Sequence, residues 1–584
     1  MNNSSGKKIR FIRYCLEGSW HFFLAGAACT CLVSVFDLIQ PKIIQYAVDE
    51  VIGGAAFSAG VLFRAASAVM AFALLGALAR YGFTLFNTMG AETLTQTLRD
   101  RLYAHILRLP FSWQSEHHTG DIIQRCTSDV EEIKVFISEQ LMALFRVVFL
   151  IVVSLVFMMS ISPLLTLVEA LFIPVTVASS FFFYTRIGGR FLRADEEEGR
   201  LSGIAQENLT GVRVVRAFGR ERHERERFER QNAYYTDLWT RLMRVLAAFW
   251  VSGNIIANVR MLIIVLLCCV LCVQGTLTAG GFIAFLSYNT MMALPVRNLG
   301  RMLSEMSKAD ISGSRLMEIL EAPEEQDREG AGTPSLKGDI VFDHVSFQYD
   351  NGDTGVLHDV SFTVPAGKTV GILGATGSGK STLMYLLDGM YDLGDGQGRI
   401  LIGGHDIRDI QKHWLRSNIG MVLQEPYLFS GTLAENIKIA APSADLCEIK
   451  KAARIAHLSS AVERFTSGYD TYVGERGVTL SGGQKQRTAI AQMLIRKPPI
   501  MVFDDSLSAV DAQTDAQIRE SLRRSTGEST VILIAHRITT LMDADFILVM
   551  EDGRIVERGT HEELLAQGGR YRQIYEMQTQ GRTL

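Results

Sequence analysis

Six long apolar stretches fill the N-terminal half of the 584-residue chain. Each has about 20 residues or more, which is the length that an α-helix needs to cross a hydrocarbon layer of about 30 Å. Buried helices of soluble proteins rarely come so long and so often. The pattern therefore predicts six transmembrane helices. They lie near residues 20–40, 61–86, 141–160, 164–184, 245–273 and 281–299.

Arginine and lysine are distributed unevenly over the connections between these stretches. Four of them lie between residues 7 and 13, and the long connections at 87–140 and 186–244 are rich in arginine. The connections at 49–60 and 274–279 contain neither residue type. Because positively charged loops stay in the cytoplasm, the N-terminus, both long connections and everything after the sixth stretch are predicted to be cytoplasmic. The long connections are polar and poor in proline, so the transmembrane helices are expected to continue through them.

The pattern changes after residue 320. Glu, Asp, Gly and Pro cluster at 321–334, which indicates a linker. Short β-rich runs then alternate with helical stretches, a pattern typical of an α/β domain with a largely parallel sheet. We therefore predict a multidomain chain with an all-α transmembrane domain at 1–320, a linker at 321–336 and an α/β domain at 337–584. The clearest β-rich runs are 339–342, 369–373, 500–503 and 530–534.

Composition agrees with two unlike halves. Hydrophobic residues make up 48% of the chain and charged residues 21%. The mean hydropathy of +0.16 is an average over an apolar N-terminal half and a polar C-terminal half. The formal net charge of −4 includes no basic excess, which argues against nucleic acid as a partner. The eight cysteines have neither a disulfide framework nor a metal-binding spacing, and we interpret them as small buried hydrophobes.

A glycine-rich loop follows the β-rich run at 369–373 and opens a predicted helix, which is the context of a Walker A phosphate-binding loop. Its backbone N–H groups and the helix N-terminus suit phosphate. Lys380 is predicted to reach the β- and γ-phosphates of ATP, and Ser381 to ligate Mg²⁺. The predicted cofactor-binding residues here are Gly374, Ala375, Thr376, Gly377, Ser378, Gly379, Lys380, Ser381 and Thr382.

Two further motifs belong to nucleotide chemistry. The apolar run at 500–503 ends in Asp504, a Walker B pattern in which the carboxylate holds Mg²⁺. Between the two Walker motifs, residues 480–484 read Leu-Ser-Gly-Gly-Gln. A serine and two glycines at a helix start suit phosphate binding, which adds Ser481, Gly482, Gly483 and Gln484 to the predicted cofactor-binding residues.

In this order the motifs resemble the ATP-binding cassette (ABC) superfamily, and six spans before one cassette resemble a half-transporter of the exporter type. The resemblance implies that Tyr349 stacks on adenine and that Gln424 contacts Mg²⁺ and senses the membrane domain. It also implies that Asp511 closes the D-loop and that His536 acts on the γ-phosphate. In such exporters two cassettes enclose two ATP molecules, each between the Walker A loop of one chain and the signature of the other.

Asp505 departs from the family pattern, which has a catalytic glutamate after the Walker B aspartate. Its carboxylate is about one methylene shorter, and a misplacement of about 1 Å can cost about a hundredfold in rate. A tolerated conservative exchange is the alternative. With the intact Leu-Ser-Gly-Gly-Gln signature, Asp505 favours the degenerate-site subunit of a heterodimeric exporter, with His536 and a weak Asp505 as its catalytic residues. The partner would be a second half-transporter with an intact glutamate.

Ionisable residues within the spans are candidates for cargo contacts. Glu169 lies in the fourth stretch, and two interpretations are open: it lines the translocation cavity and favours cationic cargo, or it pairs structurally with an arginine. Arg260 and Arg297 lie in the fifth and sixth stretches. Arg80 and Arg146 are nearer span ends, where snorkelling towards lipid headgroups is expected. Asn254, Asn289, Met291 and Met292 are weaker candidates.

The predicted function is ATP-driven export of hydrophobic or amphipathic compounds across a bacterial plasma membrane, in contact with membrane lipids. A lipid or peptide exporter of the same family is the alternative. A soluble cassette ATPase is excluded by the six spans. An ATP-gated channel stays open as a less favoured class, and a flux assay separates it from a pump.

Overall fold

The computed structural model describes residues 11–53, 59–349, 352, 354–394, 396–506, 512–525 and 527–580. The chain divides into two compact units. The helical unit contains Met1–Leu109 and His117–Pro323, and the α/β unit contains Pro110–Glu116 and Glu324–Leu584. The predicted linker at 321–336 therefore belongs mostly to the α/β unit, which also takes in a short helix from the membrane half.

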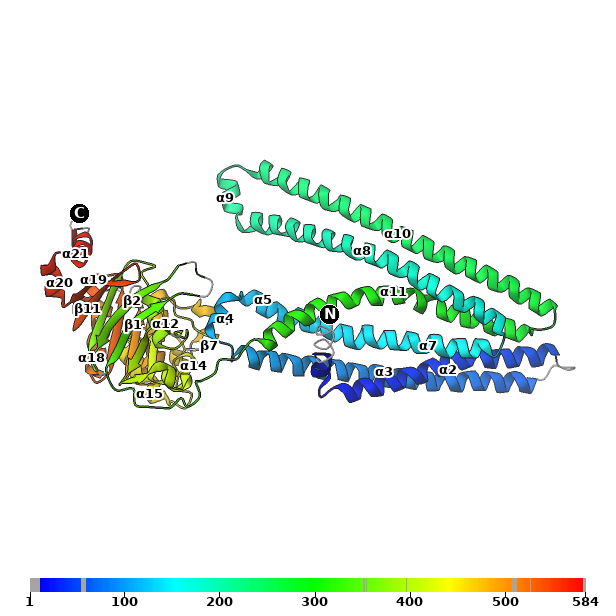
Figure 1. The fold of residues 1–584 in the computed structure, drawn as a ribbon, viewed down its shortest axis with the longest axis horizontal. Coiled ribbons are helices and arrows are strands. Elements are labelled where there is room, and N and C mark those ends of the chain that lie inside the picture. Colours follow the sequence, from blue (N-terminus) through cyan, green and yellow to red (C-terminus); the bar gives the residue numbers. More distant parts are fainter. Residues whose placement is uncertain are drawn as a thin grey trace. The chain divides into compact units, whose positions relative to one another are not determined.

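Long helices dominate the helical unit. Helices α2 and α3 run side by side, and α8 and α10 form a long hairpin that α9 closes (Figure 1). Their bounds are α2 (Trp20–Gly53), α3 (Ala59–Ile106), α5 (Thr119–Gln124), α6 (Val130–Val135), α7 (Met142–Met159), α8 (Pro163–Thr210), α9 (Val212–Ala217), α10 (Glu221–Val273) and α11 (Ala279–Glu321), with π-helical segments η1 (Arg125–Asp129) and η2 (Phe136–Leu141).

Six helical segments among the described residues are long and apolar enough to cross a membrane. Between 11% and 44% of the most apolar window of each is buried, so more than half of each window is left partly or fully exposed. A helix that is apolar all round and not covered by protein is suited to lipid. The six predicted spans are confirmed. They lie in Trp20–Val51, Gly60–Ile106, Thr119–Met159, Pro163–Thr210, Glu221–Val273 and Ala279–Gly300.

Local sequence explains where several of these helices begin. Pro163 starts α8, where its missing N–H costs no hydrogen bond. Thr278 caps α11 by accepting a 3.0 Å hydrogen bond from the backbone N–H of Gly281. The Thr278 hydroxyl also donates to Asp49 of α2 at 2.8 Å. These contacts tie the ends of the first and last spans together.

The α/β unit is built on three sheets. A six-stranded sheet has the order β12-β11-β3-β10-β9-β6, in which all neighbours are parallel except β12 with β11. A four-stranded antiparallel sheet has the order β2-β1-β4-β5, and β7 pairs with β8. The strands are β1 (Ile340–Phe347), β2 (Leu357–Val364), β3 (Thr369–Gly374), β4 (Arg399–Ile402), β5 (His405–Asp406), β6 (Ile419–Val422), β7 (Gly431–Thr432), β8 (Tyr472–Val473), β9 (Ile500–Asp504), β10 (Thr530–Ala535), β11 (Phe546–Glu551) and β12 (Arg554–Gly559).

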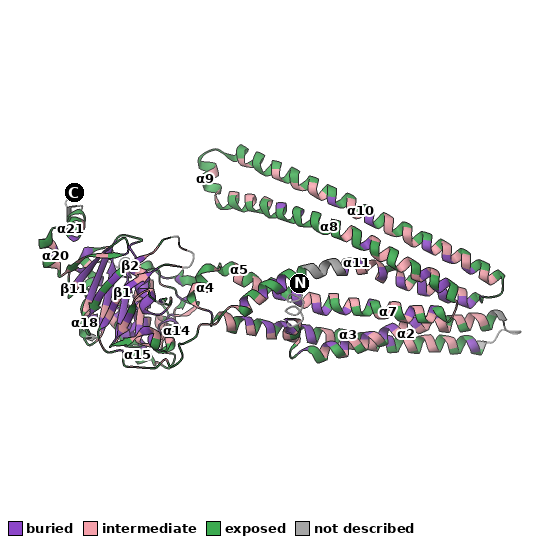
Figure 2. Ribbon diagram, in the orientation of Figure 1, coloured by how far each residue is buried: buried purple, intermediate pink, exposed green. Residues whose placement is uncertain are grey.

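Helices pack around these sheets, and the strands are largely buried (Figure 2). Strand β9 is buried along its whole length, as expected for a parallel strand covered on both faces. The predicted α/β class is confirmed. The helices are α4 (Phe111–Glu116), α12 (Lys380–Leu387), α13 (Lys412–Asn418), α14 (Leu433–Lys438), α15 (Leu446–Ile455), α16 (Ser459–Val462), α17 (Gly482–Leu494), α18 (Ala512–Ser525), α19 (Ile538–Leu541), α20 (His561–Gln567) and α21 (Arg570–Gln580).

Candidate nucleotide-binding site

The Walker A loop connects β3 to α12, as the sequence predicts. Gly377 and Gly379 have φ angles of +85° and +94°, which side chains other than glycine rarely adopt. A Cβ atom on Gly379 would also lie 2.6 Å from Leu357 Cδ2. Ala375, Thr376 and Gly377 form the exposed crest of the loop, whereas Ser378 is buried beneath it. The glycines are therefore required by the tight curl of the backbone.

Lys380 lies inside this curl and is 5% exposed. Its Nζ atom donates to the backbone carbonyls of Gly374 at 2.9 Å and Ala375 at 2.6 Å. Burial lowers the pKa of the Lys380 ammonium below its ordinary value, and the neighbouring Asp504 and Asp505 oppose that shift. The positive charge is thus concentrated under the loop, next to the backbone N–H groups that suit phosphate.

Asp504 ends β9 beside the start of α12. Its Oδ2 atom accepts a 2.9 Å hydrogen bond from the Ser381 hydroxyl. Burial raises the pKa of Asp504, and the Ser381 hydrogen bond opposes the shift. A hydroxyl and a carboxylate at this spacing are hard oxygen donors of the kind that Mg²⁺ prefers, together with phosphate and water. No cluster of three His, Cys, Asp or Glu side chains that could hold a metal occurs among the described residues. By their donor chemistry, the Ser381 hydroxyl and the Asp504 carboxylate fit a Mg²⁺ ion.

Asp505 and His536 both follow strands that end at the carboxyl edge of the large sheet. Strands β9 and β10 are parallel neighbours, with Asp504 opposite Ile534. His536 follows β10 directly, and the Asp505 backbone N–H donates to the Ile534 carbonyl at 2.9 Å. Asp505 has a φ angle of +44°, in the left-handed region that short polar side chains tolerate better than most others. The remainder of this loop, including Asp511, lies outside the described residues.

Tyr349 lies beside the first turn of α12. Its hydroxyl lies 2.9 Å from Thr382 Oγ1, and its ring packs edge-on against Tyr391 with 5.0 Å between ring centroids. Tyr391 in turn contacts α4: its ring meets Phe111 at 5.6 Å, and its hydroxyl lies 3.1 Å from Ser115 Oγ. A continuous set of contacts therefore joins α4 to the predicted adenine site. In sequence, α4 lies within the membrane half of the chain.

The signature residues lie at the start of α17. Ser481 and Gly482 are exposed, Gly483 and Gln484 are half-buried, and the Ser481 N–H donates to Gln484 Oε1 at 2.9 Å. The predicted helix start is thus in place, with the first turn open to solvent. Gln424 follows β6 by two residues and is exposed.

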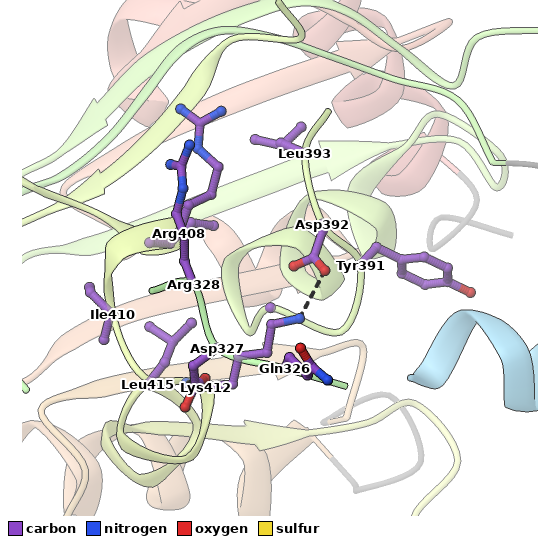
Figure 3. A pocket seen from close by; sticks show the side chains of 12 residues that line it. Gln326, Asp327, Arg328, Tyr391, Asp392, Leu393, Arg408, Ile410, Lys412 and Leu415 are labelled. Atoms are coloured by element: carbon purple, nitrogen blue, oxygen red, sulfur yellow. Dashed lines mark hydrogen bonds and ion pairs between the residues drawn. The ribbon is translucent and has the colours of Figure 1, made fainter. Parts of the chain in front are cut away.

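The hollow in Figure 3 lies at the junction between the linker and the α/β unit, and it has a volume of about 270 Å³. Its cations are already neutralised: Lys412 binds Asp392 at 2.8 Å, Arg408 binds Asp406 at 2.6 Å, and Arg328 lies 3.4 Å from Asp409. Glu325 also accepts two 2.7 Å hydrogen bonds from Arg416. These contacts anchor the linker, and they leave no cation in the hollow for a phosphate.

Known protein families match both halves of the chain. The family described as ABC transporter transmembrane region matches residues 23–296, and the family described as ABC transporter matches residues 357–508. "Putative multidrug export ATP-binding/permease protein YgaD" of Bacillus subtilis is 34% identical over 93% of this chain and 94% of its own. This chain is an ABC transporter.

Two further similarities support the assignment. "Probable multidrug resistance ABC transporter ATP-binding/permease protein YheI" of Bacillus subtilis is 34% identical over 96% of this chain and 95% of its own. The solved "Structure of a bacterial Atm1-family ABC exporter with ATP bound" superimposes with a TM-score of 0.79 at 29% identity, covering 96% of this chain and 99% of that one. The transporter therefore has the exporter fold, is a multi-pass membrane protein, and carries an ATP-binding ATPase domain.

Glu169 of the transporter does not line a cavity, so that interpretation was wrong. Its side chain is 0% exposed and accepts hydrogen bonds from Arg260 Nη1 at 2.9 Å and from Asn289 Nδ2 at 2.7 Å. Both partners are also buried. A carboxylate between apolar helices has no water to accept hydrogen bonds from. Its burial is therefore costly unless other side chains donate hydrogen bonds to it. The alternative prediction, structural pairing with an arginine, is confirmed.

The other membrane candidates also have partners. Arg297 donates to Asn254 Oδ1 at 3.1 Å and lies 4.6 Å from the centre of the Trp250 ring. Met292 is buried, and Met291 is half-buried. Arg80 is held by Asp37 of α2, with Nη2 at 3.2 Å from Oδ2. Snorkelling of Arg80 towards a span end stays a prediction.

Sequence reasoning missed three residues of the transporter. Asp37 is an acid within an apolar stretch, and the rule that singled out Glu169 could have found it. No sequence pattern singled out Tyr391 or Tyr288, because their contact partners are distant in sequence. Tyr288 of α11 is buried, and its hydroxyl donates to the Leu38 carbonyl of α2 at 2.7 Å. It places Asn289, the next residue, beside Glu169.

Proposed function

We propose that this chain is one half of an ATP-driven exporter of hydrophobic or amphipathic compounds in a bacterial plasma membrane. The observation that carries the proposal is the presence, in one chain, of six membrane spans, a formed phosphate loop and a signature helix whose first turn faces solvent. The printed names of the Bacillus relatives, which include multidrug export and multidrug resistance, support this cargo class. The nucleotide-binding domain lies in the cytoplasm, since all arginine-rich connections share its side of the membrane.

ATP binds with its phosphates over residues 374–381. Lys380 moves its ammonium from the loop carbonyls to the β- and γ-phosphates, Tyr349 stacks on adenine, and His536 and Gln424 contact the γ-phosphate side. Ser381, Asp504 and Gln424 would hold Mg²⁺, which would supply positive charge against the negative charge that develops on the phosphates. The signature residues bind the nucleotide of a second chain; they are the exposed Ser481 and Gly482 and the half-buried Gly483 and Gln484.

The second chain is a different half-transporter. Asp505 lacks the reach of a glutamate, and its left-handed backbone suits aspartate. Hydrolysis at this chain's own Walker site is therefore slow, and the partner's site, which uses this chain's intact signature, supplies most turnover. The tip around α9 fits a contact with that partner, since Val214 and Phe218 are 61% and 75% exposed although both are apolar.

Closure of the two nucleotide-binding domains reaches the membrane through α4. Phe111 and Ser115 contact Tyr391, and Tyr391 contacts Tyr349. ATP that orders Tyr349 therefore stabilises one position of α4. Transport requires only that ATP bind the outward-facing state more tightly than the inward-facing one.

Inverted membrane vesicles test the proposal. Vesicles with this chain and its partner are expected to accumulate an uncharged hydrophobic dye, such as Nile red, against its gradient when ATP is added. The Lys380→Ala variant, present at equal amounts, should abolish accumulation. Passive equilibration that needs ATP but never exceeds the external concentration would mean a channel, and would overturn the export proposal.

A further inference from the structure

Asp37 and Arg80 form an ion pair between α2 and α3 within the spans Trp20–Val51 and Gly60–Ile106. The side chain of Asp37 is 33% exposed and that of Arg80 63% exposed. An arginine within a span is costly unless it faces other protein or a water-filled space. The pair therefore marks a polar face of the two helices.

The pair lies well inside both helices. Asp37 lies 17 residues after the start of α2 and 16 before its end, and hence about 25 Å from either end at about 1.5 Å per residue. The Cα–Cβ bond of Arg80 tilts towards the Ala59 end of α3. That end lies 21 residues away, or about 31 Å, which is beyond the reach of an arginine side chain.

Arg80 keeps most of its hydrogen-bonding capacity. Only Nη2 contacts an acceptor, the carboxylate of Asp37, at 3.2 and 3.5 Å. A guanidinium has five N–H donors in a planar fork that matches a carboxylate or sulfonate. The donors on Nε and Nη1 have no acceptor among the described residues, so a ligand or water must satisfy them.

The surface of α3 around Arg80 is shallow and accessible. Ala73, Ala77 and Thr84, within two turns of Arg80, are exposed small residues. A different face of α3 presents the bulky exposed side chains Leu74, Leu78, Tyr81 and Leu85. Bulky apolar side chains suit lipid tails, whereas small residues beside a charge leave room for a polar group with an apolar body next to it.

Glu169 offers no comparable site for a cation, because Arg260 and Asn289 occupy its carboxylate. We propose that Arg80 is a cargo-binding residue that takes the carboxylate or sulfonate of an anionic amphipathic compound, with Asp37 as its resident counter-ion. This proposal rests on the proposed export function and restricts the class of compound that is exported. Anionic amphiphiles, rather than cationic ones, are the class that the accessible guanidinium recognises.

The test uses three dansyl compounds with one scaffold: 11-(dansylamino)undecanoic acid, its methyl ester, and the matching primary amine. ATP-dependent uptake is measured in proteoliposomes that contain the full chain with its partner. Arg80→Gln should lower kcat/KM for the acid at least tenfold and leave the ester unchanged. Arg80→Lys should restore part of the loss. Asp37→Asn should lower the KM for the acid severalfold, because a competing carboxylate is gone.

Arg64→Gln is the matched control, since Arg64 is an exposed arginine of the same helix that donates to the backbone of Gly60. It should change none of the three uptake rates. Equal losses for acid and ester in Arg80→Gln, or a loss of assembled complex, would assign Arg80 to structure or to the partner contact and overturn the inference. Unchanged uptake of the acid would overturn it too. If the unaltered transporter moves none of the three compounds, export of amphipathic compounds itself fails, which is a separate result.

Discussion

Two ion pairs lie within the membrane spans, and their surroundings differ. Glu169 and Arg260 have side chains that are 0% and 4% exposed, and Asn289 satisfies the second carboxylate oxygen. Asp37 and Arg80 are 33% and 63% exposed, and most of the guanidinium donors are open. The first pair connects three spans, α8, α10 and α11, whereas the second connects only α2 and α3.

The difference separates structural charges from functional ones. A buried pair is held because removing one partner leaves an uncompensated charge, although the pair itself contributes little net stability. A partly exposed ion pair contributes little to stability, and removing one of its partners costs little. A charged pair within an apolar stretch therefore needs another reason, and ligand binding supplies one.

The nucleotide site contains a similar contrast between neighbours. Asp504 is buried and bonded to Ser381, a position that fits a fixed ligand. Asp505 is half-buried on a left-handed backbone beside His536. The two adjacent aspartates therefore differ in burial, as the two ion pairs do. The proposal about catalysis concerns Asp505, the less buried of the two.

Loss of the buried carboxylate has the largest expected effect on stability. Glu169→Ala leaves Arg260 charged and buried, which should lower the free energy of unfolding by about 3–5 kcal/mol. Unfolding by sodium dodecyl sulfate in mixed micelles, followed by circular dichroism, measures it. The paired exchange Glu169→Leu with Arg260→Met removes both charges and should recover most of the loss. An unfolding curve for Glu169→Ala that matches the unaltered protein would contradict the structural role.

Tyr288→Phe should have a smaller effect. It removes one buried hydrogen bond, from the Tyr288 hydroxyl to the Leu38 carbonyl, and keeps the ring stacked on Phe157. The expected loss is about 1 kcal/mol in the same unfolding assay. A loss as large as that of Glu169→Ala would mean that the polar contacts of α11 act as one unit.

Asp37→Asn should have the smallest effect on stability, below about 0.5 kcal/mol, since the pair is partly exposed. The same variant is expected to change transport of the anionic dansyl compound. A stability loss of several kcal/mol would remove the contrast with Glu169 and make the pair structural.

Much of the architecture was predictable because its signals are local. Six apolar stretches predict six spans, and the β-rich runs at 369–373, 500–503 and 530–534 match β3, β9 and β10 to within one residue. The Walker A loop could be placed because its glycines, lysine and serine are consecutive. The helix start at Ser481 follows from the same kind of short-range pattern.

Contacts between distant residues were not predictable. Glu169 and Arg260 are 91 positions apart, and Arg80 and Asp37 are 43 apart. The packing of the helices determines which charged side chains come into contact, and this packing cannot be inferred from a single sequence. The path from Phe111 through Tyr391 to Tyr349 was missed for the same reason, because α4 joins the α/β unit from the other end of the chain.

Asp505→Asn in the assembled transporter tests the central claim about the two ATP sites most directly. The steady-state ATPase rate is measured with this chain and its partner, and Asp505→Glu is the comparison. If this chain's Walker site is the weak one, Asp505→Asn keeps more than half of the rate, and Asp505→Glu equals or exceeds the unaltered protein. A loss of about tenfold or more in Asp505→Asn would contradict the account, because Asp505 would then be the base on which turnover depends.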